Sequence, residues 1–307
     1  MKILITGASG LLGKSLYETV NQVNFLNSDL PVAKHDLSLA HYRNRISPNP
    51  VSSFSVSLDI RDRDMVFDLF EIIKPNVVIH CASVGSVDWT EDHYHEVRKV
   101  NISGLDNIID ACNGYKSKLV YISTNAVFSG DNPPYNEQSP LEPVNSYGII
   151  KKDAESLVQR EANKWLIFRP FMLYGWPYPG GRTNWAKSII EALSVKENYK
   201  VIKLVDDTIW QPTYAPDCAK AIWRLLHEEG QIYNVAAPER STLYEFGLKV
   251  CDAFGLEKNW LKPVASDCFQ SIAKRPVDTS YDLKKLSELG IMLSDIKTGL
   301  KRMKDER

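Results

Sequence analysis

A tyrosine, a lysine and a threonine supply the most readily named chemistry in this sequence. Tyr147 and Lys151 are four residues apart on a predicted helix, so their side chains share one face, and Thr124 follows a short apolar run. A free tyrosine has a pKa of about 10, and a nearby ammonium lowers that pKa by favouring the phenolate. Together the three groups can hold a carbonyl oxygen and protonate it while hydride arrives. The Tyr-x-x-x-Lys spacing alone also fits an ordinary surface pair.

Three glycines near the beginning of the chain predict a loop that binds a dinucleotide. Gly7, Gly10 and Gly13 follow the apolar residues 3–5 and lead into an amphipathic stretch. Gly7 permits a tight turn, Gly10 lets the backbone approach a pyrophosphate, and Gly13 lets the helix pack closely on the sheet. The free N–H groups at the start of that helix then face the phosphates. The alternative is a strand–helix turn without a ligand.

Further polar residues follow predicted strands and are candidates for contact with the rest of the cofactor. Asp59 can accept a hydrogen bond from an adenine amino group, and Ile60 can cover the ring. Asp59 is equally well explained as an acidic residue near the N-terminus of the helix predicted at 62–73. Asn101 lies on a predicted helix beside the fourth strand, where a solvated polar position is the competing interpretation.

The choice between the two nicotinamide cofactors depends on the end of the second strand. We place that strand at residues 32–34, which puts Lys34, His35 and Asp36 at its end. An acid here favours NAD(H), whereas basic groups accommodate the 2′-phosphate of NADP(H). Lys34 and His35, with Arg43 nearby, favour NADP(H), and NAD(H) stays open.

The elements that must position these groups alternate between strands and helices. We expect strands at residues 3–6, 54–58, 77–79, 119–122 and 166–168, and helices at 10–23, 62–73, 97–112 and 147–164. This alternation predicts an α/β fold with a Rossmann-type, doubly wound parallel sheet, whose ligands bind at the carboxyl ends of the strands. Residues 1–174 form the predicted dinucleotide-binding domain. Residues 175–307, with helices at 185–193, 216–226 and 242–254, form a smaller, partly interleaved substrate domain.

Composition and charge exclude several other classes of protein. Lysine plus arginine (37) nearly equal aspartate plus glutamate (38), so we expect neither nucleic acid nor a membrane as partner. The five cysteines are scattered without C-x-x-C spacing, which fits reduced thiols and predicts no metal site. The sequence offers neither a signal peptide nor a membrane-spanning run, which favours a cytoplasmic protein.

Several segments together resemble the extended short-chain dehydrogenase/reductases, and within them the dTDP-4-dehydrorhamnose reductase branch. The segments are residues 121–130, 133–137, 145–151, 169–175, 211–217 and 274–282. The same branch includes the regulatory β subunit of methionine adenosyltransferase, which the chain also resembles around residues 132–137.

The resemblance implies a role for each matching residue. It implies a catalytic triad of Thr124, Tyr147 and Lys151, in which Lys151 also binds the nicotinamide ribose. It implies that the pyrophosphate is contacted by Gly7, Ser9, Gly10, Leu11 and Leu12. It implies that the adenine is contacted by Asp59 and Ile60, and that the cofactor is lined after the fourth strand by Cys81 and Ala82. It also favours a cofactor role for Asn101.

The chain departs from the family after Thr124. Asn125-Ala126 replaces an acid and an aromatic residue, which leaves the substrate's identity open and argues against a sugar-nucleotide dehydratase. The candidate substrate residues are Asn125, Asn184, Trp185, Trp210 and Arg275, with Arg182 and Gln211 in the same segments. Arginine suits a diphosphate, although surface charge and core packing are the plainer interpretations of the arginines and tryptophans.

Three functions therefore compete. The first is reduction of a keto group on a nucleotide-activated deoxysugar by NAD(P)H, as in polysaccharide biosynthesis. The second is an epimerase of the same family, which returns the hydride to the same substrate. The third is a non-catalytic, cofactor-binding regulatory subunit. A homodimer is compatible with each of them.

Overall fold

The computed structural model of the protein describes residues 1–24, 37–41, 54–194 and 201–306. Among these, seven strands form one sheet in the order β10-β6-β5-β4-β1-β2-β3, and all neighbouring pairs are parallel. The strands are β1 Ile3–Thr6, β2 Leu37–His41, β3 Phe54–Ser57, β4 Val77–His80, β5 Lys118–Ile122, β6 Trp165–Pro170 and β10 Gln231–Val235. The predicted doubly wound parallel sheet is confirmed.

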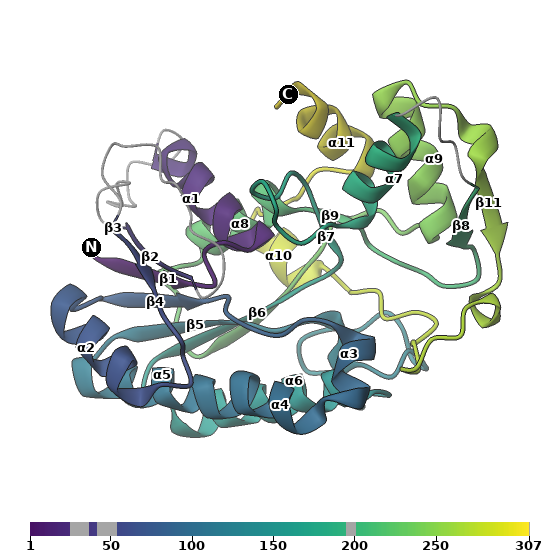
Figure 1. The fold of residues 1–307 in the computed structure, drawn as a ribbon. Helices are drawn as coiled ribbons and strands as arrows, with labels where there is room; N and C mark the ends of the chain where they lie inside the picture. The colour runs from purple at the N-terminus through teal and green to yellow at the C-terminus, as the bar shows by residue number, and fades with distance from the viewer. Residues whose placement is uncertain (25–36, 42–53, 195–200, 307) are drawn as a thin grey trace.

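Helices cover both faces of this sheet (Figure 1). On one face lie α1 (Leu11–Asn24) and α8 (Ala215–Arg224); on the other lie α2 (Arg63–Ile73), α5 (Gly104–Tyr115) and α6 (Ser146–Glu161). Side chains alternate along each strand, so Ile3 and Ile5 enter the core beside α1 and α8, whereas Leu4 enters the core on the opposite face. Because helices cover both faces, strands β1, β4 and β5 are mainly apolar, which is why the sequence shows these three as continuous apolar runs.

A second group of elements lies beyond the carboxyl edge of the sheet, on the right of Figure 1. It comprises α7 (Trp185–Ser194), α9 (Leu243–Phe254) and α11 (Ile296–Asp305), which share one core, and the pairs β8 (Ile202–Val205) with β11 (Leu261–Val264) and β7 (Leu173–Tyr174) with β9 (Thr213–Tyr214). The short helix α10 spans Lys284–Glu288. Strand β10 comes from this half of the chain yet pairs with β6 at the edge of the large sheet.

The second strand was predicted in the wrong place. Residues 32–34 lie outside the described residues, and β2 is Leu37–His41, paired with β1. Lys34 and His35 therefore precede this strand in the sequence, so the prediction that they stand at its carboxyl end is wrong. The sequence LSLAH interrupts its apolar run with a serine and a histidine, which hid the strand. Arg43 follows the strand in the sequence and also lies outside the described residues.

The helix expected at 97–112 is present, but it starts earlier, ends later and contains a π-helical turn. Short helices α3 (Val87–Asp92) and α4 (Tyr94–Arg98) come first, a π-helical turn spans Lys99–Ser103, and α5 follows directly. Such π-helical turns often mark functional positions. Among the residues that the structure describes, no helix is both long enough and apolar enough to cross a bilayer, and no cluster of three metal-binding side chains occurs.

Candidate active site

The turn after β1 is built so that two of its glycines cannot be replaced. Gly7 has φ +64°, and a Cβ there would lie 2.5 Å from the backbone nitrogen of Ala82. A Cβ on Gly13 would lie 2.6 Å from Ala8 Cα, so α1 packs directly on the turn. Gly10 differs, because it is exposed and a Cβ there would meet only the carbonyl oxygen of Gly7, at 3.2 Å. The open backbone at Gly10 and the start of α1 fit a bound pyrophosphate.

Neighbouring residues border the same turn. Ser9 and Leu11 are half-buried, whereas Leu12 belongs to the core beside α1. Cys81 and Ala82, directly after β4, are half-buried, and burial raises the pKa of the Cys81 thiol to about 12, which keeps it protonated.

His80 joins the two strand ends beneath this turn. Its Nδ1 lies 2.8 Å from the hydroxyl oxygen of Thr6, and the backbone N–H of Cys81 donates to the Thr6 carbonyl at 3.1 Å. Burial, with the nearby Lys151 ammonium, lowers the His80 pKa to about 3, so the ring is neutral. The carboxyl ends of β1 and β4 are thereby held at a fixed separation.

The two predicted adenine contacts are already engaged by the protein. The Asp59 carboxylate forms an ion pair with Arg61 at 2.6 Å, and the hydrogen bond from Arg61 lowers the pKa of Asp59. The Ile60 side chain is 5% exposed and fills the space above Gly104. It therefore offers little surface to a ring.

Asn101 lies in the π-helical turn and fixes the loop after β4. Its Oδ1 accepts from the Val84 backbone N–H at 2.8 Å, and its Nδ2 donates to the Val84 carbonyl at 3.1 Å. Because the carboxamide is buried and paired at both ends, it shapes the loop through the backbone of Val84.

Tyr147 and Thr124 meet where α6 begins. The Asn145 carboxamide caps this helix by accepting from the Gly148 backbone N–H at 2.8 Å, which leaves Tyr147 in the first turn. The Tyr147 phenol lies close enough to the Thr124 hydroxyl for the two side chains to interact. Burial raises the pKa of Tyr147, and the Thr124 hydroxyl and the Arg182 guanidinium oppose that shift. We expected the Lys151 ammonium to lower this pKa; the structure gives the opposite direction, because burial outweighs the nearby charges.

Lys151 is buried one turn further along α6. Its Nζ donates to the Ile122 carbonyl at 2.6 Å and lies 4.2 Å from the centroid of the Tyr121 ring. Burial lowers the pKa of Lys151 to about 7, while the Glu155 carboxylate opposes that shift. The amine is thus held at the carboxyl end of β5 and can titrate near neutral pH.

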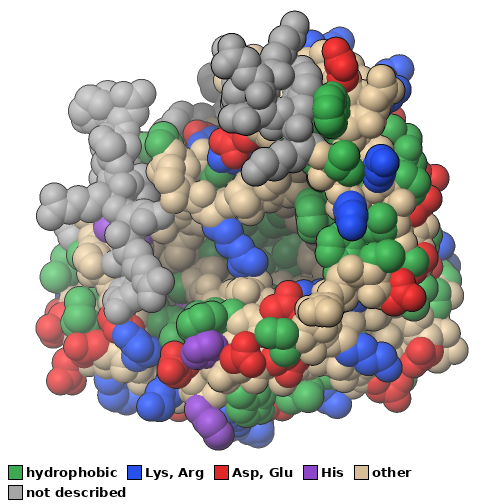
Figure 2. Space-filling model, turned by 45° about the vertical axis from the view of Figure 1, so that its right-hand side comes forward, with side chains coloured by type: hydrophobic (Ala, Val, Ile, Leu, Met, Phe, Trp, Pro, Cys, Tyr) green, Lys and Arg blue, Asp and Glu red, His purple; other side chains and the backbone are tan. Residues whose placement is uncertain are grey.

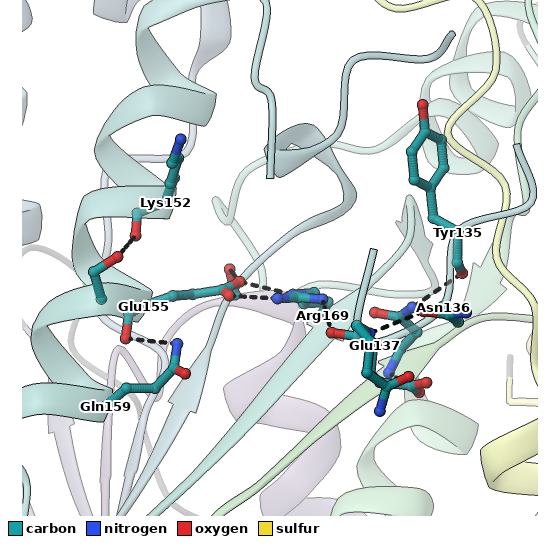
Figure 3. A network of polar contacts seen from close by, with 11 residues as sticks. Tyr135, Asn136, Glu137, Lys152, Glu155, Gln159 and Arg169 are labelled. Carbon is teal, nitrogen blue, oxygen red and sulfur yellow. Dashed lines mark hydrogen bonds and ion pairs between the residues drawn. The ribbon is translucent and has the colours of Figure 1, made fainter. Parts of the chain in front are cut away.

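A buried ion pair that the sequence did not reveal supports this arrangement (Figure 3). Glu155 and Arg169 are 0% and 1% exposed and make two contacts, Nη2–Oε2 at 2.6 Å and Nε–Oε1 at 2.9 Å. The Ser123 hydroxyl, next to Thr124, donates to the same carboxylate at 2.5 Å. The Arg169 Nη1 donates to the Glu137 carbonyl at 3.4 Å. The pair therefore joins α6, β6 and Ser123, which directly follows β5, close to Lys151.

Two predicted substrate residues bind other parts of the protein. Asn125 donates through Nδ2 to the Thr279 hydroxyl at 2.8 Å. Arg275 forms an ion pair with Asp88 of α3, Nη2–Oδ2 at 2.7 Å, and also donates to a backbone carbonyl. The charge of Arg275 is therefore already matched.

The other three predicted substrate residues differ in exposure. Asn184 donates to the Gly175 carbonyl at 2.8 Å and accepts from the Lys187 backbone N–H at 3.3 Å, so it shapes the start of α7. Trp210 is half-buried and donates through its indole N–H to Thr208 at 2.8 Å, which fits packing. Trp185 is 41% exposed and keeps a free ring surface.

Arg182, in the loop before α7, reaches the catalytic groups. Its Nη1 lies 3.2 Å from the position of a Cβ on Gly85, and Tyr147 Oη lies 4.0 Å from that same position. Figure 2 shows one face of the molecule hollowed, with lysine or arginine side chains on the wall of the hollow. Sequence spacing gave no sign that this arginine approaches Tyr147, because the two are 35 residues apart on separate elements.

Comparison with known proteins gives the same family over the whole chain. A sequence model described as "RmlD substrate binding domain" matches residues 1–307. Methionine adenosyltransferase 2 subunit beta of Mus musculus is 28% identical over 311 residues, covering 98% of this chain and 86% of the relative. The dTDP-4-dehydrorhamnose reductase of Aggregatibacter actinomycetemcomitans is 26% identical over 317 residues, covering 99% and 98%.

Solved structures agree with these sequence relatives. A dTDP-4-dehydrorhamnose reductase from Bacillus anthracis, in complex with NADP, has a TM-score of 0.82 and 28% identity, with 99% of each chain covered. A dTDP-4-dehydrorhamnose reductase from Clostridium acetobutylicum has a TM-score of 0.81 and 25% identity, covering 100% and 99%. A UDP-glucose 4-epimerase from Thermus thermophilus, at 21% identity and a TM-score of 0.80, shares the fold.

Proposed function

Since the chain belongs to the RmlD substrate-binding-domain family, we propose that it reduces a keto group on a nucleotide-activated deoxysugar with NAD(P)H. One observation carries the proposal: Tyr147, Thr124 and Lys151 gather at the carboxyl end of β5, two strands from the glycine turn that follows β1. In an open parallel sheet this edge is where ligands bind. The dTDP-4-dehydrorhamnose reductases among the relatives support a nucleotide-activated deoxysugar as the class of substrate.

The cofactor is proposed to be NADP(H), with its pyrophosphate at Gly10 and the start of α1, where the backbone is open. When bound, the reduced nicotinamide cofactor would supply the hydride. Lys34 and His35 precede β2, so they no longer support the choice of NADP(H) as residues at the end of that strand. The support comes instead from the Bacillus anthracis reductase, which is 28% identical to this chain and was solved in complex with NADP. Asn101 and His80 act through the protein by fixing the loop after β4 and the strand ends.

The protein's own groups would then manage the proton. The raised pKa of Tyr147 keeps its phenol protonated at neutral pH, which is the form that can donate to a ketone oxygen. The Thr124 hydroxyl, beside Tyr147, would orient the same oxygen. Lys151, with a pKa of about 7, is proposed to bind the nicotinamide ribose and to add positive charge beneath the phenol when protonated.

The direct test is consumption of NADPH in the presence of dTDP-4-dehydrorhamnose, with purified Tyr147→Phe as the matched control. We expect one NADPH consumed per ketone reduced and turnover reduced by about 10²–10⁴-fold in the variant. Stoichiometric consumption also separates a reductase from an epimerase, which returns hydride to the same sugar. Consumption of NADPH that is unchanged in Tyr147→Phe would refute the assignment.

A second candidate is supported by the similarity to methionine adenosyltransferase 2 subunit beta, at 28% identity over 98% of the chain. In that case the chain would bind the dinucleotide and a partner protein without turnover. Absence of turnover on a panel of ketosugar nucleotides, together with retained NADPH binding, would favour this function. We further propose that residues 175–307 mainly contribute the substrate side of the site, in a cytoplasmic, homodimeric protein of polysaccharide biosynthesis.

A further inference from the structure

Arg182 is an exposed cation at the site whose charge the protein leaves unmatched. Neither a hydrogen bond nor an ion pair joins its guanidinium to any residue of the described ranges. The side chain lies over Gly85, in the loop after β4, with Tyr147 Oη close to the same glycine. The missing side chain at Gly85 therefore leaves space between the guanidinium and the catalytic phenol.

Nearby cations are engaged elsewhere. Arg275, the more obvious candidate from the sequence, pairs with Asp88 at 2.7 Å. Lys187 pairs with Glu191 at 2.5 Å, and Lys151 points inward to a backbone carbonyl. Of these groups, Arg182 is the one whose charge is available to a ligand, and its planar guanidinium can contact two oxygens of a phosphate at once.

We propose that Arg182 binds the phosphate attached to the sugar of the substrate, across the sugar ring from the ketone that Tyr147 and Thr124 hold. This inference rests on the proposed function and specifies which residue anchors the substrate's anionic part. A ketone that faces Tyr147 places the rest of the sugar nucleotide away from the phenol, and Arg182 borders that space at Gly85. Arg275 then acts indirectly, by fastening the segment around Ala273 to α3.

Binding of dTDP tests the anchor without catalysis. Calorimetric titrations with dTDP and with thymidine, both at saturating NADP⁺ so that the glycine turn is filled, would compare wild type, Arg182→Gln and Arg182→Lys. Arg160→Gln removes the same charge from an exposed pair at the far end of α6 and is the control. We expect Arg182→Gln to weaken dTDP binding about ten-fold or more and to leave thymidine binding unchanged. Arg182→Lys should be intermediate, since it keeps the charge but loses the two-pronged contact.

Two results of the titrations would overturn the proposal. Binding of dTDP to Arg182→Gln as tight as to Arg160→Gln would remove the anchor. Weaker binding of NADP⁺ itself to Arg182→Gln would assign the arginine to the cofactor instead.

Kinetics separate this proposal from the proposed function. If the anchor is correct, Arg182→Gln raises KM for the sugar nucleotide while kcat and the KM for NADPH stay within a few-fold. An unchanged KM with a shifted pH profile would show that Arg182 acts on Tyr147, and would overturn the anchor while leaving the reductase. Wild-type protein that binds dTDP through Arg182 but reduces no ketosugar would refute the reductase and leave the anchor in place.

Discussion

The Glu155–Arg169 pair offers a prediction whose size follows from burial. Both side chains are almost completely buried, so Glu155→Gln leaves the Arg169 guanidinium without its counter-charge inside the protein. Breaking such a pair by removing one partner costs about 3–5 kcal/mol. The matched control is Asp110→Asn, which breaks the exposed Arg63–Asp110 pair and should cost about 0–1 kcal/mol.

The same substitution should also alter catalysis through Lys151. Glu155 is the charge that most strongly opposes the lowering of the Lys151 pKa. The other groups facing the amine are His80 at the end of β4, Cys81 directly after it, and the ring of Tyr121. Without Glu155 the Lys151 pKa should fall further below about 7. As the pH rises, the amine would then lose its proton at a lower pH than in the wild type. If a step needs the protonated amine, the alkaline limb of the kcat/KM profile should therefore move to more acidic pH.

A double variant separates the two effects. Glu155→Gln with Arg169→Met removes both charges, so the stability should largely return, whereas the acidic shift of the pH profile should remain. Urea unfolding measures the first effect and the pH dependence of kcat/KM measures the second. A loss below about 1 kcal/mol in Glu155→Gln would refute the argument for stability, because an exposed pair costs no more than that. An unshifted profile in both variants would refute the argument for Lys151.

Three further predictions concern the cradle, the threonine and the histidine. Gly10→Val should abolish binding of NADPH in a fluorescence titration while the fold persists, whereas Gly13→Val should unfold the protein, because its Cβ would lie 2.6 Å from the Cα of a neighbouring residue. Thr124→Val should reduce kcat less than Tyr147→Phe does, since it removes one hydrogen bond to the substrate. His80 has a pKa of about 3 against an ordinary 6.5, so its contribution to stability is present above pH 6.5 and is lost as the pH falls towards 3. The stability difference between wild type and His80→Asn, by urea unfolding, should therefore shrink by about 2 kcal/mol between pH 7 and pH 5.

Each of these has an outcome that contradicts it. Normal affinity for NADPH in Gly10→Val would remove the pyrophosphate from the turn, and a stable Gly13→Val would contradict the close packing of α1. A Thr124→Val variant as slow as Tyr147→Phe would give the threonine an equal share in proton transfer. A stability difference for His80→Asn that does not change with pH would contradict a neutral, buried ring.

The sequence was sufficient for elements whose pattern is local. Strands β1, β4 and β5 are uninterrupted apolar runs because helices cover both faces of the sheet, and the capped starts of α2 and α6 were predicted to within one residue. The glycine turn was predictable because the backbone that crowds these glycines is close by in the fold. A Cβ on Gly13 would meet Ala8, five residues away, and a Cβ on Gly7 would meet Ala82, just after the neighbouring strand β4. Strand β10 was missed because QIYNV mixes polar and apolar residues at the edge of the sheet.

Contacts between distant elements were beyond the sequence. The approach of Arg182 to Gly85 and the pairing of Glu155 with Arg169 depend on how strands and loops pack, and no spacing rule joins them. Arg275 was interpreted as a substrate group because its partner, Asp88, lies on a short helix that was not predicted. The direction of the Tyr147 pKa was wrong for the same reason, since burial is set by the whole fold rather than by Lys151.

The most direct test of the account follows the hydride itself. NADPH that carries deuterium at its transferable position is incubated with the protein and dTDP-4-dehydrorhamnose, and the sugar product is analysed by mass spectrometry. The account predicts one deuterium at the former carbonyl carbon for each NADPH consumed, and formation slower by about 10²–10⁴-fold in Tyr147→Phe, which still binds NADPH. A wild-type protein that binds both ligands yet places no deuterium in the sugar would contradict it, as would transfer by Tyr147→Phe at the wild-type rate.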